Sequence, residues 1–208
     1  MSDQATLHDA YAADYDAQVS AYDCYLAEAL FGLCYDFVQP GQSLLDLGIG
    51  SGLSAAPFAR AGLRVAGMDF APGMLDLCRT KGITADLRQH DLRQLPWPYA
   101  AASFDHVICV GVFHFIGSLE TGFAESARVV RPGGLFAFTT KWPNVPLAPN
   151  EPFVHHAEGS LDVFSHAPDT VAALLAGAGF DCLRQLRCYV GQAVFAVWVG
   201  RRHDHIFR

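Results

Sequence analysis

The chain has 208 residues, of which 51% are hydrophobic and 17% are charged. That composition supplies enough apolar material for a folded domain of above-average size and excludes a disordered protein. A formal net charge of -7 argues against a nucleic-acid partner, because such a partner requires Lys and Arg clustered on one face. We expect one domain over residues 1–208, present as a monomer or a homodimer.

The six cysteines lie far apart, without a C-x-x-C pair, and several occur in apolar runs. This pattern predicts reduced thiols in the core. The N-terminus lacks the basic start and apolar centre of a signal peptide, and no apolar run reaches the roughly 18 residues of a membrane span. The expected location is the cytoplasm, with no membrane association.

Short apolar runs alternate with longer helical ones, which predicts a parallel sheet with helices on both faces. Strands are expected at 43–48, 63–69, 83–91, 103–112 and 135–142, and helices at 54–61, 72–82, 119–130 and 169–178. The R-P-G-G sequence at 131–134 is expected to end a helix with a sharp turn. Two closing strands, 182–190 and 192–200, joined through Gly191, favour an antiparallel hairpin. The prediction is an α/β, Rossmann-like fold with a seven-stranded, mostly parallel sheet and an antiparallel last strand.

Two segments fall outside this alternation. Residues 1–40, with a start rich in Tyr and Asp, are expected to form an N-terminal helical cap segment. Residues 143–168 contain five prolines and three histidines. We expect them to form a long loop on the substrate side, because loops of this length in compact domains usually act as lids or binding loops.

The sequence L-L-D-L-G-I-G-S-G, residues 44–52, places a glycine-rich turn directly after the first strand. Glycines let the backbone approach a ligand closely. Their spacing fits the dinucleotide fingerprint only in its looser form, and no Lys-Ser or Lys-Thr follows for a phosphate loop. Asp46 would repel a pyrophosphate and attract a cationic ligand, by roughly 4 kcal/mol at about 4 Å and a dielectric constant of about 20, before desolvation is subtracted. The charge of Asp46 therefore favours a cationic ligand.

The motif D-x-G-x-G-x-G formed by Asp46, Gly48, Gly50 and Gly52 resembles the first motif of the class I S-adenosylmethionine-dependent methyltransferases. The resemblance extends over about 180 residues through V-A-G-M-D-F-A-P-G-M-L, H-D-L, F-D-H-V-I-C-V-G-V-F-H and V-V-R-P-G-G-L-F-A-F-T. The chain is most similar to small-molecule enzymes such as those of ubiquinone biosynthesis. It also resembles methyltransferase-like proteins with an N-terminal Y-x-x-x-Y-D, here Tyr11, Tyr15 and Asp16. The implied cofactor is S-adenosyl-L-methionine, and the implied partner is a small-molecule methyl acceptor.

The resemblance implies contacts to the adenosine part of the cofactor. Asp69 would accept hydrogen bonds from the ribose hydroxyls, which suits a group with only acceptors; the alternative is a capping aspartate before the next helix. Phe70 would lie against the adenine face, or pack on that helix. Asp91 and Leu92 would bind the adenine edge, or Asp91 would cap a turn.

The resemblance also implies contacts near the methyl group. Val110 or Gly111, at the end of the fourth strand, would border the methionine portion, although core packing explains Val110 equally well. Tyr15 would lie on a helical face that closes over the cofactor, and a plain amphipathic helix is the alternative. His114 is the candidate general base, with a structural or pocket-lining role as the alternative. The histidines of 143–168 lack metal-site spacing, so no metal is expected.

The implied reaction displaces a methyl group from a sulfonium by a nucleophilic atom of the acceptor. Holding donor and acceptor in line can supply much of the rate, so a dedicated catalytic side chain is not required. Two other functions stay open: an NAD(P)-dependent oxidoreductase with a Rossmann-type domain, and a non-catalytic S-adenosylmethionine-binding protein.

Overall fold

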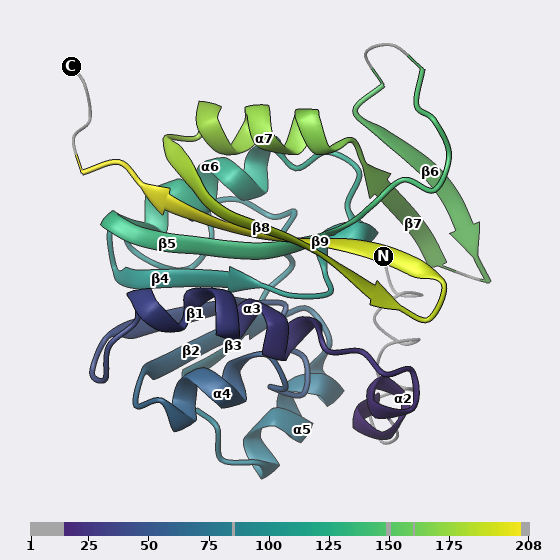
Figure 1. Cartoon of the computed structure of the whole chain (residues 1–208). Coiled ribbons are helices and arrows are strands. Elements are labelled where there is room, and N and C mark those ends of the chain that lie inside the picture. The colour runs from purple at the N-terminus through teal and green to yellow at the C-terminus, as the bar shows by residue number, and fades with distance from the viewer. Residues whose placement is uncertain (1–14, 85, 149–150, 160, 205–208) are drawn as a thin grey trace.

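The computed structural model describes residues 15–84, 86–148, 151–159 and 161–204. Within them the chain forms one nine-stranded sheet (Figure 1). Its parallel core has the order β3-β2-β1-β4-β5. These strands are β1 (Ser43–Leu47), β2 (Arg64–Asp69), β3 (Asp86–Gln89), β4 (Phe104–Cys109) and β5 (Val130–Lys141). The predicted α/β fold with a mostly parallel sheet is confirmed.

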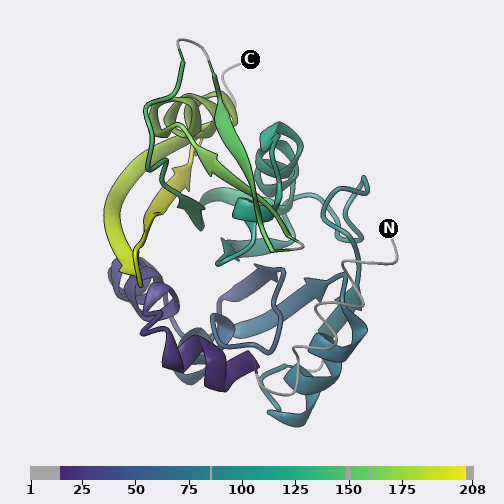
Figure 2. The same cartoon turned by 90° about the vertical axis from the view of Figure 1, so that its right-hand side faces the viewer.

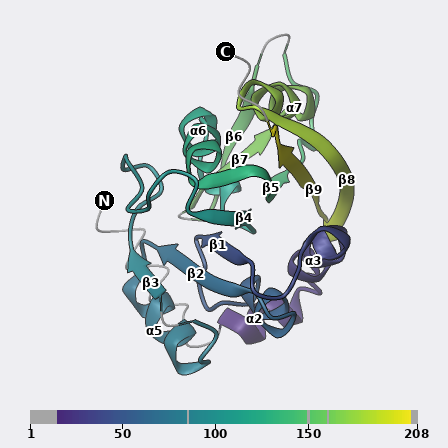
Figure 3. The ribbon, with the colours of Figure 1, turned by 90° about the vertical axis from the view of Figure 1, so that its left-hand side faces the viewer.

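Helices cover both faces of the sheet because successive strand residues point to opposite sides (Figure 3). Leu44 packs in the hydrophobic cluster that includes residues of three helices: α3 (Leu26–Cys34), α4 (Ala55–Arg60) and α5 (Pro72–Thr80). Leu45 and Leu47 pack in the opposite cluster, with residues of α6 (Glu120–Val129) and α7 (Pro168–Gly177). The helix α2 (Tyr15–Ala21) precedes α3, and the 3-10 helix η2 (Tyr35–Phe37) follows it. None of the helices in the described ranges is long and apolar enough to cross a membrane.

The sheet has nine strands, so the prediction of seven is wrong. The two additional strands, β6 (Phe153–Glu158) and β7 (Leu161–His166), form an antiparallel hairpin inside the segment expected to be a loop. β7 joins the sheet through one parallel pairing, Lys141 with Ser165. The prolines of this segment lie outside the two strands. The pairing of β6 with β7 is a tertiary feature with little local pattern, so the sequence by itself predicts a loop here.

The R-P-G-G sequence lies inside β5 and does not precede it, which corrects the predicted turn. β4 and β5 pair from Phe104 with Val130, and the register then shifts before His106 pairs with Leu135. A Cβ atom at Gly134 would collide with the backbone oxygen of Asp105. Glycine is therefore required here for close approach of two strands.

The closing hairpin is confirmed. β8 (Phe180–Val190) pairs antiparallel with β9 (Ala193–Arg202), and β9 pairs antiparallel with β5 from Leu135 to Lys141. β8 has no strand on its other side within the described residues. The sheet therefore branches beyond β5, with β9 and β8 on one path and β7 and β6 on the other.

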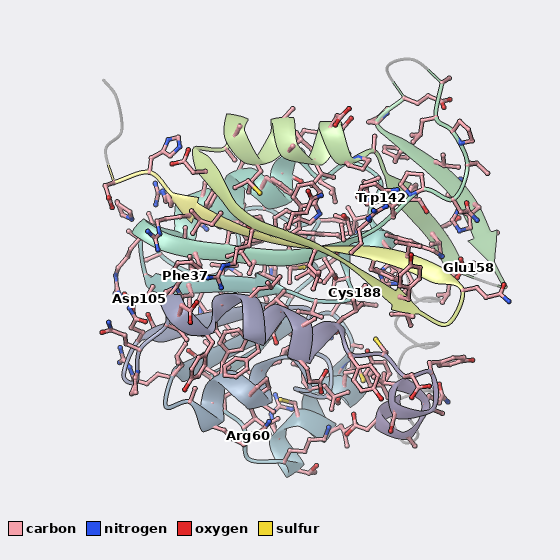
Figure 4. The ribbon with its side chains drawn as sticks, in the orientation of Figure 1. Phe37, Arg60, Asp105, Trp142, Glu158 and Cys188 are labelled. Atoms are coloured by element: carbon pink, nitrogen blue, oxygen red, sulfur yellow. The ribbon has the colours of Figure 1, made fainter. Side chains whose placement is uncertain are left out.

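The parallel strands end at one side of the molecule. Figure 4 shows Asp105, near the start of β4, at the opposite end from Trp142, which follows β5. Figure 2 looks onto the end where the strands finish, with the β6–β7 hairpin above and α2 below. The chain order reverses between β1 and β4, and open parallel sheets bind ligands at the carboxyl ends beside such a point.

We expect Gly134→Ala to lower the free energy of unfolding by about 1–3 kcal/mol, because backbone atoms on the facing strand cannot move aside as a side chain can. Urea denaturation measures this. Gly177→Ala is the control, since a Cβ there would meet nothing within 4 Å. A similar loss of stability in both variants would contradict the steric explanation.

Candidate functional site

The glycine-rich turn after β1 is held by hydrogen bonds to the end of β2. The backbone N–H groups of Gly48 and Ile49 donate to the carbonyl oxygen of Met68, at 2.8 and 3.1 Å. Gly48, Gly50 and Gly52 have φ values of 66°, 53° and 87°, which favour glycine. A Cβ atom at Gly48 would lie 2.5 Å from the Val112 side chain, whereas one at Gly50 would meet only the Gly48 oxygen, at 3.9 Å. The turn is thus packed on one side and open at Gly50.

Asp69, at the end of β2, ties this turn to the next helix. One carboxylate oxygen accepts from the N–H of Gly50 at 2.9 Å, and the other from the N–H of Ala71 at 2.9 Å. Ala71 is the N-cap residue of α5, which has no side-chain cap hydrogen bond, so Asp69 contacts the residue before the helix without capping it. A carboxylate has about four acceptor sites, so these bonds are compatible with a further ribose contact, which stays a prediction.

Asp46 lies beneath the turn and has no exposed surface. One oxygen accepts from the Ser54 hydroxyl at 2.6 Å, and the other, Oδ1, has no hydrogen-bond partner within the described residues. Burial raises the pKa of Asp46 to about 7, with the nearby Asp69 charge adding to the effect and the Ser54 bond opposing it. The predicted attraction of a cationic ligand requires an ionised Asp46 close to that ligand. The structure instead buries Asp46 below the turn and outside the cavity lining.

A cavity of about 230 Å³ opens between this turn, α2 and the end of β4. It brings together the predicted residues Tyr15, Gly48, Gly50 and Val110, and also Gly111. Among the described residues that line it, three are carboxylates and none is Lys or Arg; the carboxylates are Asp16, Asp23 and Glu28. This distribution of charge suits a ligand with positive charge.

Tyr15 closes one side of the cavity. Its side chain packs with Ala71 and Met74 at the start of α5. Burial raises the pKa of Tyr15 to about 12, and nearby carboxylates contribute. Tyr15 therefore faces the cavity as a neutral phenol. Tyr11, its predicted partner on the same face, lies outside the described residues.

The predicted adenine contacts lie away from the cavity lining. Asp91 forms an ion pair with Arg93 at 2.7 Å and accepts from the Arg93 backbone N–H at 2.9 Å. The hydrogen bonds from Arg93 lower the pKa of Asp91. Leu92 packs against the core, and its carbonyl accepts from the Trp97 indole at 3.0 Å. Phe70 is half-buried just after β2. The turn-capping alternative for Asp91 matches these contacts, and its adenine contact stays a prediction.

His114 lies in the 3-10 helix η3 (Phe113–Phe115), beyond the end of β4. Its ring centroid is 3.9 Å from that of Phe115 and 5.4 Å from that of Phe195. It is half-buried and is not part of the cavity lining. The structure therefore places His114 in an aromatic cluster beside the site.

The histidines expected in the long loop belong to the β6–β7 hairpin. His155 contacts Asp162 at 2.7 Å, His156 contacts Glu158 at 3.0 Å, and His166 contacts the carbonyl of Ile116 at 2.9 Å. Within the ranges that the structure covers, no three metal-binding side chains gather in one place.

Ser51 and Ser54 were missed as candidate site residues. Both belong to the cavity lining, and Ser54 is the donor to Asp46. The sequence signal that could have identified them is the presence of small hydroxyl residues within and directly after a glycine-rich turn. Gly52, which was predicted, faces away from the cavity, where a Cβ atom would collide with Ile83.

The fold and the turn define a Rossmann-like α/β domain with a glycine-rich turn at the carboxyl ends of its parallel strands. Residues 45–138 match the family described as "Methyltransferase domain". The resemblance to class I S-adenosylmethionine-dependent methyltransferases is thereby confirmed over residues 45–138, and the fold of the chain is like theirs.

Individual relatives agree with this assignment. Malonyl-(acyl-carrier protein) O-methyltransferase of Serratia marcescens is 36% identical over 131 residues, covering 62% of this chain and 49% of that protein. The chain thus spans about half the length of the curated relatives that it matches.

Two solved structures share the fold. A chain from the complex between the Haloferax volcanii Trm112 methyltransferase activator and a methyltransferase has a TM-score of 0.74 at 20% identity, covering 94% of this chain and 97% of that chain. The 1,6-didemethyltoxoflavin-N1-methyltransferase of Burkholderia thailandensis, solved with its substrate and S-adenosylhomocysteine, has a TM-score of 0.71 at 21% identity, covering 97% and 89%.

The raised pKa of Asp46 predicts a pH-dependent stability. The unfolded chain releases this proton near pH 4 and the folded chain near pH 7, so the folded state binds more protons between these values. Stability should therefore fall as pH rises through this window, by at most roughly 1.4 kcal/mol per pH unit. Relative to the wild type, Asp46→Asn should gain stability from pH 4 to pH 7 in urea denaturation.

Ser54→Ala provides a second variant for this experiment. Removing the Ser54 donor should raise the pKa of Asp46 further, because that bond stabilises the ionised form. The fall in stability should then continue above pH 7. Parallel pH profiles for the wild type and Asp46→Asn would show that Asp46 ionises at an ordinary pH.

Proposed function

We propose that this protein is an S-adenosylmethionine-dependent methyltransferase that acts on a small-molecule acceptor. The observation that carries the proposal is the turn of Gly48, Gly50 and Gly52, which opens at Gly50 into a cavity at the carboxyl ends of β1 and β4. The methyltransferase-domain match over residues 45–138 supports the same conclusion.

The residues present fit this cofactor. A side chain at Gly50 would project into the cavity, so a glycine there leaves room for a ligand against the backbone. The carboxylates of the lining suit the positive charge of a sulfonium and an amino group. An anionic pyrophosphate would be repelled by the same residues, which disfavours the NAD(P)-dependent alternative.

The mechanism follows from what these residues can hold. The bound cofactor supplies an electrophilic methyl group. The glycine turn would hold that group from below, Tyr15 and α2 would cover it, and Asp69, which holds the turn, would accept from its ribose hydroxyls. Covering the site excludes water and fixes the direction of attack, and such alignment can contribute roughly 7–11 kcal/mol in favourable cases.

We propose that the acceptor enters beside η3 and the β6–β7 hairpin, with His114 facing it. Relatives act on different acceptors, as the names of the malonyl-(acyl-carrier protein) and didemethyltoxoflavin enzymes state. We further propose that residues 1–208 form a single domain whose N-terminal 40 residues cap the site. We also propose that the protein is a cytoplasmic monomer or homodimer without nucleic-acid or membrane partners.

Gly50→Val and Asp69→Ala should each weaken S-adenosylmethionine binding at least tenfold in titration calorimetry while leaving unfolding cooperative. A valine side chain at position 50 would project into the cavity, and loss of the carboxylate removes charge-assisted hydrogen bonds worth about 1.5–3 kcal/mol each. Gly191→Val is the matched control, because its φ of 56° is close to that of Gly50 but it lies in the β8–β9 turn.

Ligand binding and product formation by the wild-type protein distinguish the three candidate functions. Binding of NAD without binding of S-adenosylmethionine would overturn the proposal in favour of an oxidoreductase. Binding of S-adenosylmethionine without formation of S-adenosylhomocysteine across metabolite fractions would favour a non-catalytic binding protein.

His114→Gln tests the general-base role once an acceptor is identified in that screen. Loss of a general base should lower kcat by about 10²-fold or more and remove the pH dependence that this base confers, while cofactor binding stays unchanged. A fall in kcat of less than about threefold would leave His114 with a packing role against Phe115 and Phe195.

A further inference from the structure

Within the part of the chain that the structure describes, the helix α2 covers the cavity with little apolar attachment of its own. It has seven residues, and none of them is fully buried. Figure 1 shows it beside α5, at the end of the molecule where the parallel strands finish. Tyr15 provides its apolar contact, with Ala71 and Met74. A short helix with so little buried surface depends on polar contacts to stay in place.

Those polar contacts converge on one side chain, Asp16. One carboxylate oxygen accepts a hydrogen bond from the Ser51 hydroxyl at 2.6 Å, and the other forms an ion pair with Lys81 directly after α5. The carboxylate therefore joins three parts of the chain: α2, the glycine-rich turn and the end of α5. We call this arrangement the Asp16 latch.

The latch spans the cavity itself. Asp16, in α2, and Ser51, in the glycine-rich turn, both line the cavity. Moving α2 away from the turn requires breaking their hydrogen bond and the ion pair with Lys81. The side chains of Lys81 and Asp16 are 25% and 37% exposed, so solvent screens the pair and the latch is weak enough to open.

We infer that Asp16 is a positioning residue whose latch to Ser51 and Lys81 holds α2 closed and sets the rate at which the bound cofactor leaves. This inference rests on the proposed function. It concerns the dissociation rate, which usually carries most of the effect of a local change on affinity.

Asp16→Asn tests the latch, because the amide keeps an acceptor for Ser51 but loses the ion pair with Lys81. Using S-adenosylhomocysteine as the probe and surface plasmon resonance on the immobilised full chain, we expect dissociation to become roughly two- to fivefold faster. Association should not become slower. Faster dissociation together with slower association would indicate a distorted site and overturn the inference, as would an unchanged dissociation rate.

Lys81→Met separates the latch from a direct attraction between Asp16 and the cationic probe. If Asp16 acts by its charge alone, removing Lys81 strengthens that attraction and slows dissociation. If the latch acts, dissociation becomes faster, and the double variant Asp16→Asn with Lys81→Met is no faster than the quicker single variant. Slower dissociation in Lys81→Met, or additive effects, would contradict the latch.

Asp76→Asn is the matched control, since Asp76 forms an exposed ion pair with Arg79 on the same helix, α5. Its dissociation rate should equal that of the wild type. Increasing salt should speed dissociation from the wild type more than from Asp16→Asn, because salt screens the ion pair that the variant lacks. If the wild type does not bind the probe at all, the proposed function fails, whereas binding with wild-type rates in Asp16→Asn rejects the latch alone.

Discussion

The hydrogen bond from the Gly50 N–H to the Asp69 carboxylate is the contact on which the arrangement of the site depends. It joins the glycine-rich turn after β1 to the end of β2, and the Met68 carbonyl reinforces it through Gly48 and Ile49. These groups meet because β1 and β2 pair in parallel register, Leu47 opposite Met68. The other oxygen of Asp69 accepts from the N–H of Ala71, the residue before α5, so one carboxylate contacts both the turn and the segment against which Tyr15 packs.

The buried carboxyl of Asp46 shows a second constraint. An ionised group without exposure is costly, and Asp46 has one firm donor, Ser54, with the Asp69 charge nearby. A carboxyl that is partly protonated near neutral pH reduces this cost. Asp46 therefore supports the turn from below, and the charges that face the cavity come from α2, the segment after it and the first turn of α3.

The two ends of the sheet serve different purposes. At the starting end, Asp105 accepts from the N–H and hydroxyl of Ser43 and pairs with Arg131, so β1, β4 and β5 are tied together; its pKa is lowered to about 2 although burial opposes this. At the finishing end lie α2, η3 and the β6–β7 hairpin, all of them short elements (Figure 2), and α2 lines the cavity. A rigid base with short covering elements is an arrangement in which ligands can enter without disturbing the sheet.

The sequence alone determined the central fold and the turn. Alternating apolar runs indicate which residues are buried, and the spacing of Gly48, Gly50 and Gly52 indicates the local backbone geometry. Both can be predicted from residues that are close together in the sequence. Only the tertiary structure decided that β6 and β7 pair, that Asp46 is buried under Ser54, and that Asp16 reaches Ser51 and Lys81. Several of these contacts join residues far apart in the chain, and the burial of Asp46 depends on the packing of the whole sheet. Local sequence patterns therefore carry no record of them.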